Sequence, residues 1–437
     1  MKIGGPSAHA AAACPKRGVR ILPLEAAMAR LRPRFICLAL PFCACGNDLA
    51  NEEGNLSAED TGSIVTELAP RQAPDREFLA RCGDGGPVEA ALSLRRPYLQ
   101  EVTPRGALMV VHPPAGMPVE LAVTTLAGVP VTNVAAEADP TVPDGSQQLG
   151  RLTQLEPANS YCYAVSGITE AAGFRTAPEA GANAKVSFAA FGDSGSGRPD
   201  QRALFEQLQT VPLDFIVHTG DLAYDAGTPD QIEHNVFDVY APLLRSFALY
   251  PIVGNHDYAT DRAAPFLHAF VLPENGNPAQ AERWYSFDWG DVHFVALDTE
   301  QIAEEQAAWL DADLQANPLP WTVVFAHRPP YSSGEHGGEP AFREQFVPIL
   351  EHYRVPLVLS GHDHDYERTN VLNGVTYVVT GGGGRGTRNV GHSSFTAFSQ
   401  EVIHFVFIEI EGPRLVLHAI DATGREFDQA VLELVHE

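Results

Sequence analysis

Five segments of the chain end in the same way, with an apolar run followed closely by side chains that can bind a metal ion. These runs are Phe188–Phe191, Phe215–Thr219, Leu249–Val253, Val323–Ala326 and Leu357–Ser360. The side chains that follow them are Asp193, Asp221, Tyr224, Asn255, His327, His362 and His364. A catalytic zinc ion usually takes three protein ligands and keeps an open position, so this set is too large for one such ion. It predicts two metal ions that share a bridging carboxylate.

The donor types favour two different cations. An aspartate, a tyrosine phenolate and one histidine form a hard, anionic set that suits a trivalent ion such as iron. An asparagine, two histidines and the bridging aspartate suit a divalent ion such as zinc, manganese or iron. His362 and His364 lie two residues apart and, on a loop, can serve neighbouring metals.

Strands and helices that alternate along the chain are expected to position these side chains. Seven strand candidates run from Val186–Phe191 to Thr376–Val379, with helical segments such as Gln201–Gln209 and Gln301–Gln315 between them. This pattern predicts a layered α/β catalytic domain over residues 185–437. Ligands of open α/β sheets bind beyond the carboxyl ends of the strands, so we expect the five loops to meet in one crevice.

The region upstream has a different pattern. Residues 93–178 contain short alternating strands, such as Ala107–Val111 and Tyr161–Val165, separated by Pro/Gly turns, which predicts a small all-β sandwich. It offers no catalytic groups, and we expect it to pack beside the catalytic domain. Residues 46–92 are rich in Gly, Ala, Pro and acidic residues and are expected to be a flexible linker.

Residues 1–45 are expected to form a leader. A basic run followed by the apolar segment Phe35–Ala44 is typical of a secretory signal and is too short to span a bilayer. Met28 is a candidate for the true start, which leaves the preceding residues as an extension without a role. The end of the segment resembles a bacterial lipoprotein cleavage box with Cys45 as the lipidated residue. We therefore expect export to the periplasm or the extracellular space, or a lipid anchor at a bacterial membrane. The alternative is a poorly ordered leader with an accidental apolar patch.

The composition restricts the partners. A net charge of −26 argues against a nucleic acid, since binding a phosphate backbone needs basic patches. A small phosphorylated substrate would need a local positive centre, which a metal cluster supplies. Cys82 and Cys162 could pair in an oxidising compartment or remain two free thiols. No sequence feature points to a particular oligomeric state.

The motif series GDSG, GDLAY, GNHD, VFAH and GHDHDYERT resembles the metallophosphoesterase superfamily and, within it, the purple acid phosphatases. The resemblance covers about residues 185–437 and implies a layered β-sandwich core with flanking helices. The module before it resembles a fibronectin type III domain. Many metallophosphoesterases carry Asp-x-His in the first motif. Here Gly195 stands at the histidine position and Tyr224 supplies the missing ligand, as in the purple acid phosphatase branch.

Carried over position by position, the resemblance divides the seven donors between two cations. It assigns Asp193, Tyr224 and His364 to iron(III), assigns Asn255, His327 and His362 to the divalent ion, and makes Asp221 the bridge. One departure is Asp257, where plant members usually carry glutamate, which affects the surroundings of the ligands but not the ligand set.

The implied activity is that of an acid phosphatase, which cleaves phosphate monoesters by attack of a metal-bound hydroxide. His256 and His336 match histidines that face the substrate, and either could protonate the leaving alkoxide. The glycine-rich run Gly381–Gly386 lacks the Lys-Ser/Thr of a P-loop and is interpreted as a turn. Two alternative functions are phosphodiester or nucleotide hydrolysis on the same metals, and an exported surface module with a vestigial site.

Overall fold

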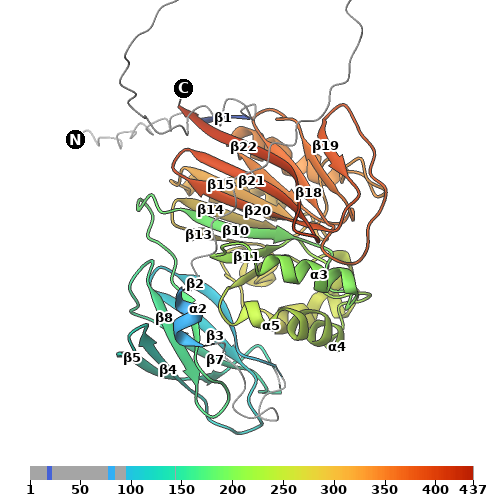
Figure 1. Cartoon of the computed structure of the whole chain (residues 1–437). Coiled ribbons are helices and arrows are strands. Elements are labelled where there is room, and N and C mark those ends of the chain that lie inside the picture. Colours follow the sequence, from blue (N-terminus) through green and yellow to red (C-terminus); the bar gives the residue numbers. More distant parts are fainter. Residues whose placement is uncertain (1–16, 22–76, 84–94, 143, 437) are drawn as a thin grey trace, which may run out of the picture.

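The computed structural model describes residues 17–21, 77–83, 95–142 and 144–436 (Figure 1). The predicted signal segment, Met28 and the lipidation site Cys45 lie outside these residues. Within the described part of the chain, no helix is both long and apolar enough to cross a membrane.

The first region is an all-β module, as predicted. Its strands form two four-stranded sheets in which every neighbouring pair is antiparallel. One sheet has the order β2 (Tyr98–Thr103), β3 (Gly106–Val111), β7 (Gln148–Leu152), β6 (Glu137–Ala138). The other has the order β5 (Pro130–Ala135), β4 (Glu120–Thr125), β8 (Ser160–Val165), β9 (Ala172–Arg175). Its likeness to fibronectin type III stays a prediction.

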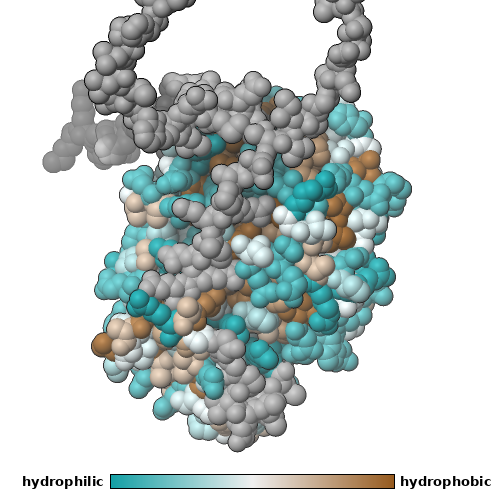
Figure 2. Space-filling view, in the orientation of Figure 1, coloured by the Kyte–Doolittle hydropathy of each residue, from teal (hydrophilic) through white to brown (hydrophobic). Residues whose placement is uncertain are grey.

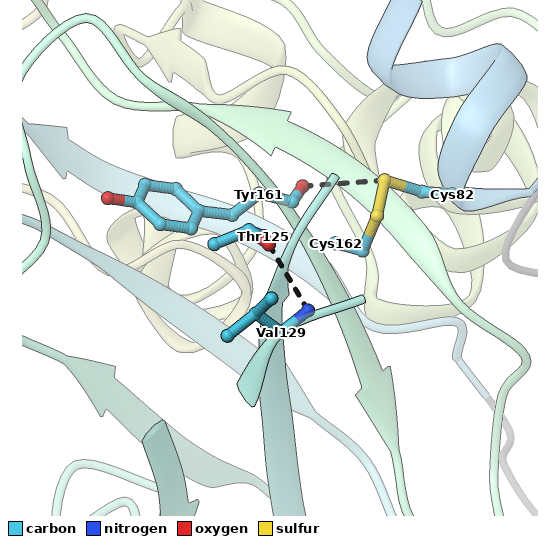
Figure 3. The surroundings of a disulfide bond; sticks show 5 residues. All are labelled: Cys82, Thr125, Val129, Tyr161 and Cys162. Atoms are coloured by element: carbon cyan, nitrogen blue, oxygen red, sulfur yellow. Dashed lines mark hydrogen bonds between the residues drawn. A yellow bond between two sulfur atoms is a disulfide. The ribbon is translucent and has the colours of Figure 1, made fainter. Parts of the chain in front are cut away.

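A disulfide between Cys82 and Cys162 resolves the question that the sequence left open (Figure 3). It joins helix α2 (Glu77–Cys82) to β8 across 80 residues of sequence, with the two Cα atoms 5.2 Å apart. Phe78 of this helix packs on Gly173 of the module and edge-on to Phe247 of the next region. The helix therefore lies where the module meets the catalytic region.

Hydrogen bonds between buried groups fix the module to the catalytic region. The Gln100 amide donates to the carbonyl of Leu249 at 3.0 Å, and its oxygen accepts from the backbone N–H of Val271 at 3.2 Å. The Tyr250 hydroxyl donates to the carbonyl of Val102 at 3.2 Å. Buried polar groups that find hydrogen-bond partners across an interface favour one arrangement of the two regions.

Two seven-stranded sheets form the catalytic region. The first has the order β1 (Arg17–Ile21), β22 (Glu426–His436), β21 (Arg414–Asp421), β20 (His404–Glu411), β10 (Val186–Phe191), β11 (Phe215–His218), β12 (Leu249–Pro251). The second has the order β13 (Tyr285–Trp289), β14 (Val292–Leu297), β15 (Trp321–Ala326), β16 (Leu357–Ser360), β18 (Thr376–Thr380), β17 (Tyr366–Thr369), β19 (Thr396–Gln400). The arrangement is the predicted layered β-sandwich core with flanking helices.

Aromatic side chains fill the space between the two sheets. Phe188 and Phe215 of the first sheet meet Phe294 of the second at centroid distances of 5.2 and 5.1 Å. Every residue of β10 and of β14 is buried, as expected for strands covered on both faces. Strands β10, β11 and β12 are parallel to one another, as are β14, β15, β16 and β18. Each set therefore presents its carboxyl ends along one edge of its sheet.

Helices cover the outer faces. Near the first sheet lie α3 (Pro199–Leu208), α4 (Pro229–Ile232), a π-helical turn (Glu233–Phe237), α5 (Asp238–Leu244), α6 (Asn255–Tyr258), a 3₁₀ turn (Asp261–Ala263) and α7 (Ala264–Ala269) (Figure 1). Another 3₁₀ turn (Pro278–Gln280) precedes β13, and α8 (Glu304–Ala316), α9 (Pro340–Gln345) and α10 (Val347–His352) pack on the second sheet. Leu310 of α8 and Phe342 of α9 are completely buried in the cluster with Val324 of β15.

Two features of the fold differ from expectation or add to it. Arg17–Ile21, inside the predicted leader, is the edge strand β1 and pairs antiparallel with β22, so this part of the extension has a structural place. His293 on β14 is held between Asp288 of β13 and Asp313 of α8, each with a nitrogen–oxygen distance of 2.7 Å. Burial disfavours charge on His293, but its two carboxylate partners outweigh burial and raise its pKa to about 9.

The visible face of the molecule is a mixture of hydrophilic and apolar residues (Figure 2). Among the described residues, the large apolar side chains that are exposed are Val129 and Val131, which flank the first residue of β5. Two such side chains at one hairpin are ordinary for a soluble surface and do not indicate a docking site.

Candidate metal centre

The predicted ligands lie at the carboxyl ends of strands from both sheets. Asp193 follows β10, Asp221 follows β11, and His362 follows β16, and these three residues have φ values of 58°, 55° and 69°. A positive φ is uncommon for residues with a Cβ and concentrates at functional sites, where the surrounding structure holds the strained backbone. His327 comes directly after β15, and Asn255 is the first residue of α6 after β12. Both sheets therefore supply donors to one place.

Three side chains meet around the hydroxyl of Tyr224, which brings four residues together. Its oxygen lies 3.0 Å from Asp193 Oδ1, 2.8 Å from Asp221 Oδ2 and 3.2 Å from His364 Nε2. All four residues are buried. A phenol has one proton and can donate to only one of these three neighbours. Burial and the two carboxylates together raise the pKa of Tyr224 well above its ordinary value, so the cluster is rich in acceptors and poor in positive charge.

Two further donors, Asn255 and His362, meet around His327 together with Asp221. The Nδ1 of His327 faces the carbonyl oxygen of Thr219 at 2.9 Å and must carry a proton there, because a carbonyl only accepts. Its Nε2 lies 3.1 Å from Asn255 Oδ1, 3.5 Å from Asp221 Oδ1 and 3.2 Å from His362 Nδ1. In the neutral ring, Nε2 therefore has no proton, and its lone pair points at two oxygen atoms that are also acceptors. This arrangement favours a cation between Nε2 and the two oxygens. Burial lowers the pKa of His327, but nearby Asp221 and Asp193 raise it overall, which reflects the same need for positive charge.

Asp221 connects the two groups of donors. One of its oxygens lies beside Tyr224, and the other lies on the side of His327. One ligand atom each from Asp193, Asp221 and His327 can be chosen so that all three lie within 4.8 Å of one another. The contacts given above join all seven predicted ligands into one network. Their oxygen and imidazole donors, short of protons and buried, fit a metal centre with a carboxylate between two positions.

Asp257 ties together the loops that carry the donors. Its carboxylate accepts from the backbone N–H groups of Gly254 at 2.9 Å, Leu222 at 3.1 Å and Ala223 at 3.3 Å. Burial, together with the charge of Asp221, raises the pKa of Asp257 to about 7. The Asp257 side chain therefore fixes the Asp221 loop against the start of α6, and its role here is structural.

The two histidines that were predicted to face substrate flank the donors. His256 donates its backbone N–H to Asp221 Oδ1 at 2.9 Å, and its ring lies 4.5 Å from that of Tyr224. Its Nδ1 donates to the carbonyl of Asp225 at 2.6 Å, which leaves Nε2, 3.9 Å from Asp221 Oδ2, as the nitrogen for chemistry. His336 stacks on His362 with ring centroids 4.4 Å apart. Burial and a neighbouring arginine lower the pKa of His336.

Three arginines at the site were missed from the sequence. Arg328 forms a two-pronged ion pair with Glu300 at 2.7 and 3.0 Å, and its NH1 lies 3.0 Å from His362 Nε2. Arg385 pairs with Asp225 at 2.7 Å. Arg388 hydrogen-bonds His336. The only available signal was that two of them, Arg385 and Arg388, lie in or next to the glycine-rich run.

The glycine-rich run packs closely behind the donors. A Cβ on Gly381 would lie 2.1 Å from the carbonyl of Asp363 and 2.8 Å from Asp193 Oδ2, so only glycine allows this approach. Gly383 and Arg385 donate backbone N–H groups to the carbonyls of Gly192 and Asp193. The run is a turn, as interpreted, and it lines the site.

Comparisons with known proteins agree with this geometry. Residues 186–366 match the model of the calcineurin-like phosphoesterase family. Purple acid phosphatase 1 of Ipomoea batatas is 29% identical over 227 residues, which cover 47% of this chain and 48% of that protein. Human tartrate-resistant acid phosphatase type 5 is 25% identical over 293 residues, covering 56% of this chain and 90% of that protein.

A solved structure shares the fold. The purple acid phosphatase from yellow lupin (Lupinus luteus) seeds superposes with a TM-score of 0.67 at 20% identity, covering 79% of this chain and 74% of that one. The chain spans about half the length of the plant and mycobacterial relatives that it matches. Residues 186–366 thus match a calcineurin-like phosphoesterase domain, and over this part of the sequence the chain is similar to the purple acid phosphatases, in agreement with the buried donors.

Proposed function

We propose that the protein is an acid phosphatase that hydrolyses small phosphate monoesters at a centre of two metal ions, iron(III) and a divalent zinc, manganese or iron. One observation carries the proposal. The two oxygens of Asp221 face different groups of donors, Tyr224 with its neighbours on one side and His327 on the other. A shared carboxylate between a phenolate-containing set and a histidine-containing set suits a trivalent and a divalent cation side by side.

The remaining ligands divide accordingly. Asp193, Tyr224 and His364 would hold iron(III), whereas Asn255, His327 and His362 would hold the divalent ion. When bound, the cations supply an activated water and neutralise the charge of the phosphate. That neutralisation matters because the chain itself has a net charge of −26 and would otherwise repel an anionic substrate.

The protein supplies orientation and a proton. The hydrogen bond from His256 Nδ1 to the carbonyl of Asp225 fixes the ring, so that its Nε2 is directed to the same side as Asp221 Oδ2. A proton held on His256 Nε2 can pass to the leaving alkoxide, a step worth roughly 10²–10⁴-fold in rate. His336 is the weaker candidate for this step, because its Nε2 already accepts a hydrogen bond from Arg388.

The test compares the purified chain with an Asp221→Asn variant. We expect the wild type to contain two metal ions, to absorb visible light through a tyrosinate–iron(III) pair, and to hydrolyse an aryl phosphomonoester faster than the matching diester. Asp221→Asn should lose metals and activity together. The same change at Asp238, an exposed residue paired with His234, should alter neither.

Each rival function predicts another result. Faster cleavage of the diester would replace the proposal with a phosphodiesterase, and a wild type without metals would mean a vestigial site. An active Asp221→Asn variant without metals would refute the mechanism itself.

The compartment and the partners are part of the same proposal. The Cys82–Cys162 disulfide supports export, since such bonds persist in oxidising compartments. Fractionation of the source cells, with and without Cys45→Ala, separates a lipid-anchored protein from a freely secreted or cytosolic one. No nucleic acid partner is expected for a chain of this charge.

A further inference from the structure

Arg388 lies beside the proposed metal ligand His362 and differs from the other arginines at the site. Its NH1 donates to His336 Nε2 and lies 3.4 Å from the carbonyl oxygen of His362. Its backbone N–H donates to the carbonyl of His364 at 3.0 Å, which fixes the residue at the edge of the donor cluster. The residue is half-buried, so it is partly exposed to solvent.

The other two arginines have anionic partners, and Arg388 has none among the residues that the structure describes. Arg328 is paired with Glu300 and Arg385 with Asp225. Among the described residues, no carboxylate oxygen lies within 4.0 Å of the Arg388 guanidinium nitrogens. In a chain with a net charge of −26, an arginine beside the donor cluster without a carboxylate partner can bind an external anion.

Neighbouring residues fix the orientation of the Arg388 side chain. His336 accepts its NH1 hydrogen bond, and the His336 ring is stacked on His362 with an angle of 26° between the planes. The backbone N–H of His336 donates to Asp363 Oδ1 at 2.8 Å, which fixes His336 in turn. His336 is therefore a positioning residue for Arg388.

The position relative to the donors suggests which anion. His362 directs Nδ1 toward His327, whereas Arg388 contacts the carbonyl oxygen of His362 and the His336 ring that stacks on His362. Arg388 therefore contacts the proposed ligand His362 through its backbone carbonyl and through the neighbouring His336. That place suits a charge carried by the leaving group better than the oxygens of the phosphoryl group that reacts.

We propose that Arg388, oriented by His336, binds negative charge on the leaving group, so that the site selects phosphoric compounds whose leaving group is itself anionic, above all diphosphates. The proposal rests on the proposed function and specifies its substrate class. Water adds to the terminal phosphorus as the P–O bond to the leaving group breaks, a proton of that water passes to solvent, and the leaving group departs with its own phosphate still bound to Arg388. A hydrogen bond between charged groups predicts a roughly 10- to 100-fold preference over an equivalent neutral leaving group.

The test measures binding as well as turnover. Calorimetry gives the affinity of the metal-loaded chain for methylenediphosphonate, which cannot be hydrolysed, and for methylphosphonate, which lacks the second charge. Kinetics gives kcat/KM for pyrophosphate and for phenyl phosphate. We compare wild type, Arg388→Gln, Arg388→Lys and the matched control Arg385→Gln, which removes the same charge from the same turn.

We expect Arg388→Gln to lower both ratios, diphosphonate to phosphonate and pyrophosphate to phenyl phosphate, at least 10-fold, chiefly through the diphosphate members. Arg388→Lys should restore part of the preference, and Arg385→Gln should change it less than threefold. An equal loss for both ligands of a pair, or an equal effect of Arg385→Gln, would overturn the assignment. A wild type that hydrolyses neither pyrophosphate nor phenyl phosphate would refute the proposed function instead, while the binding ratio would still report on Arg388.

Discussion

Gly195 offers the sharpest test of how the donor loops are held. A Cβ added here would lie 1.5 Å from the carbonyl oxygen of Leu222, 2.4 Å from its carbonyl carbon and 2.9 Å from the Cα of Ala223. All three are backbone atoms, so no side-chain rotation relieves the clash. The Gly195 carbonyl also accepts the N–H of Tyr224 at 2.7 Å, so the two loops cannot separate without breaking this bond.

The size of the effect follows from these distances. Ordinary van der Waals contact begins at 3.4 Å, so Gly195→Ala must move the Leu222 carbonyl by about 1.9 Å. That loop carries Asp221 and Tyr224, and a functional side chain must stay within about 0.5 Å of its working position. We expect a stability loss of about 1–3 kcal/mol from overpacking and a fall in kcat/KM of at least about 100-fold.

Four measurements check this prediction: metal content per chain, visible absorption, kcat/KM and the urea midpoint of unfolding. The control is Gly412→Ala in the turn between β20 and β21, where φ is +55° and nothing lies within 4 Å of the added Cβ. Its cost of about 1 kcal/mol comes only from the left-handed backbone, and metals and activity should remain. A Gly195→Ala variant with two metals and activity within threefold of wild type would refute the reasoning.

Three other predictions concern separate parts of the molecule. Replacing Cys82 and Cys162 together by serine removes a bridge across 80 residues and should destabilise the chain by up to about 4–5 kcal/mol, seen as a lower urea midpoint than that of the oxidised wild type. His293 has a folded pKa of about 9 against about 6.5 when unfolded, so its contribution is complete below pH 6.5 and lost as the pH rises through 9. The stability difference between wild type and His293→Gln should shrink over that window, and a constant difference would contradict the ion-pair account. Tyr224→Phe should abolish the visible absorption band while the protein stays folded by circular dichroism, and a band that persists would exclude a tyrosinate ligand.

The elements that carry the donors could be predicted because they are buried on both faces. The runs Val186–Phe191 and Val292–Leu297 are apolar except for Ser187 and His293, and β10 and β14 have the same bounds. All seven predicted ligands meet because each follows such a strand or its turn, and parallel strands bring their carboxyl ends to the same edge.

Elements stabilised by distant polar partners were not predicted. Strand β17 has the sequence YERT, which lacks an apolar run, and its Arg368 is held by Asp428 through two bonds of 2.7 and 2.9 Å. Its Glu367 is buried and accepts from Ser333 at 2.6 and 2.8 Å. The same reason hid Arg388, since nothing local connects it to His336, 52 residues away. Tertiary contacts, not local pattern, decide such positions.

The division of the donors between two sheets has a consequence for how the protein matures. Asp193 and Asp221 follow strands of one sheet, and His327 and His364 follow strands of the other. Each bound cation would therefore link the two sheets at the carboxyl ends of these strands. Metal binding would then complete folding, because the free energy of ion binding adds to the free energy that holds the two sheets together. The supply of free ions where a new chain completes its fold would set its lifetime against proteases as well as its catalytic competence.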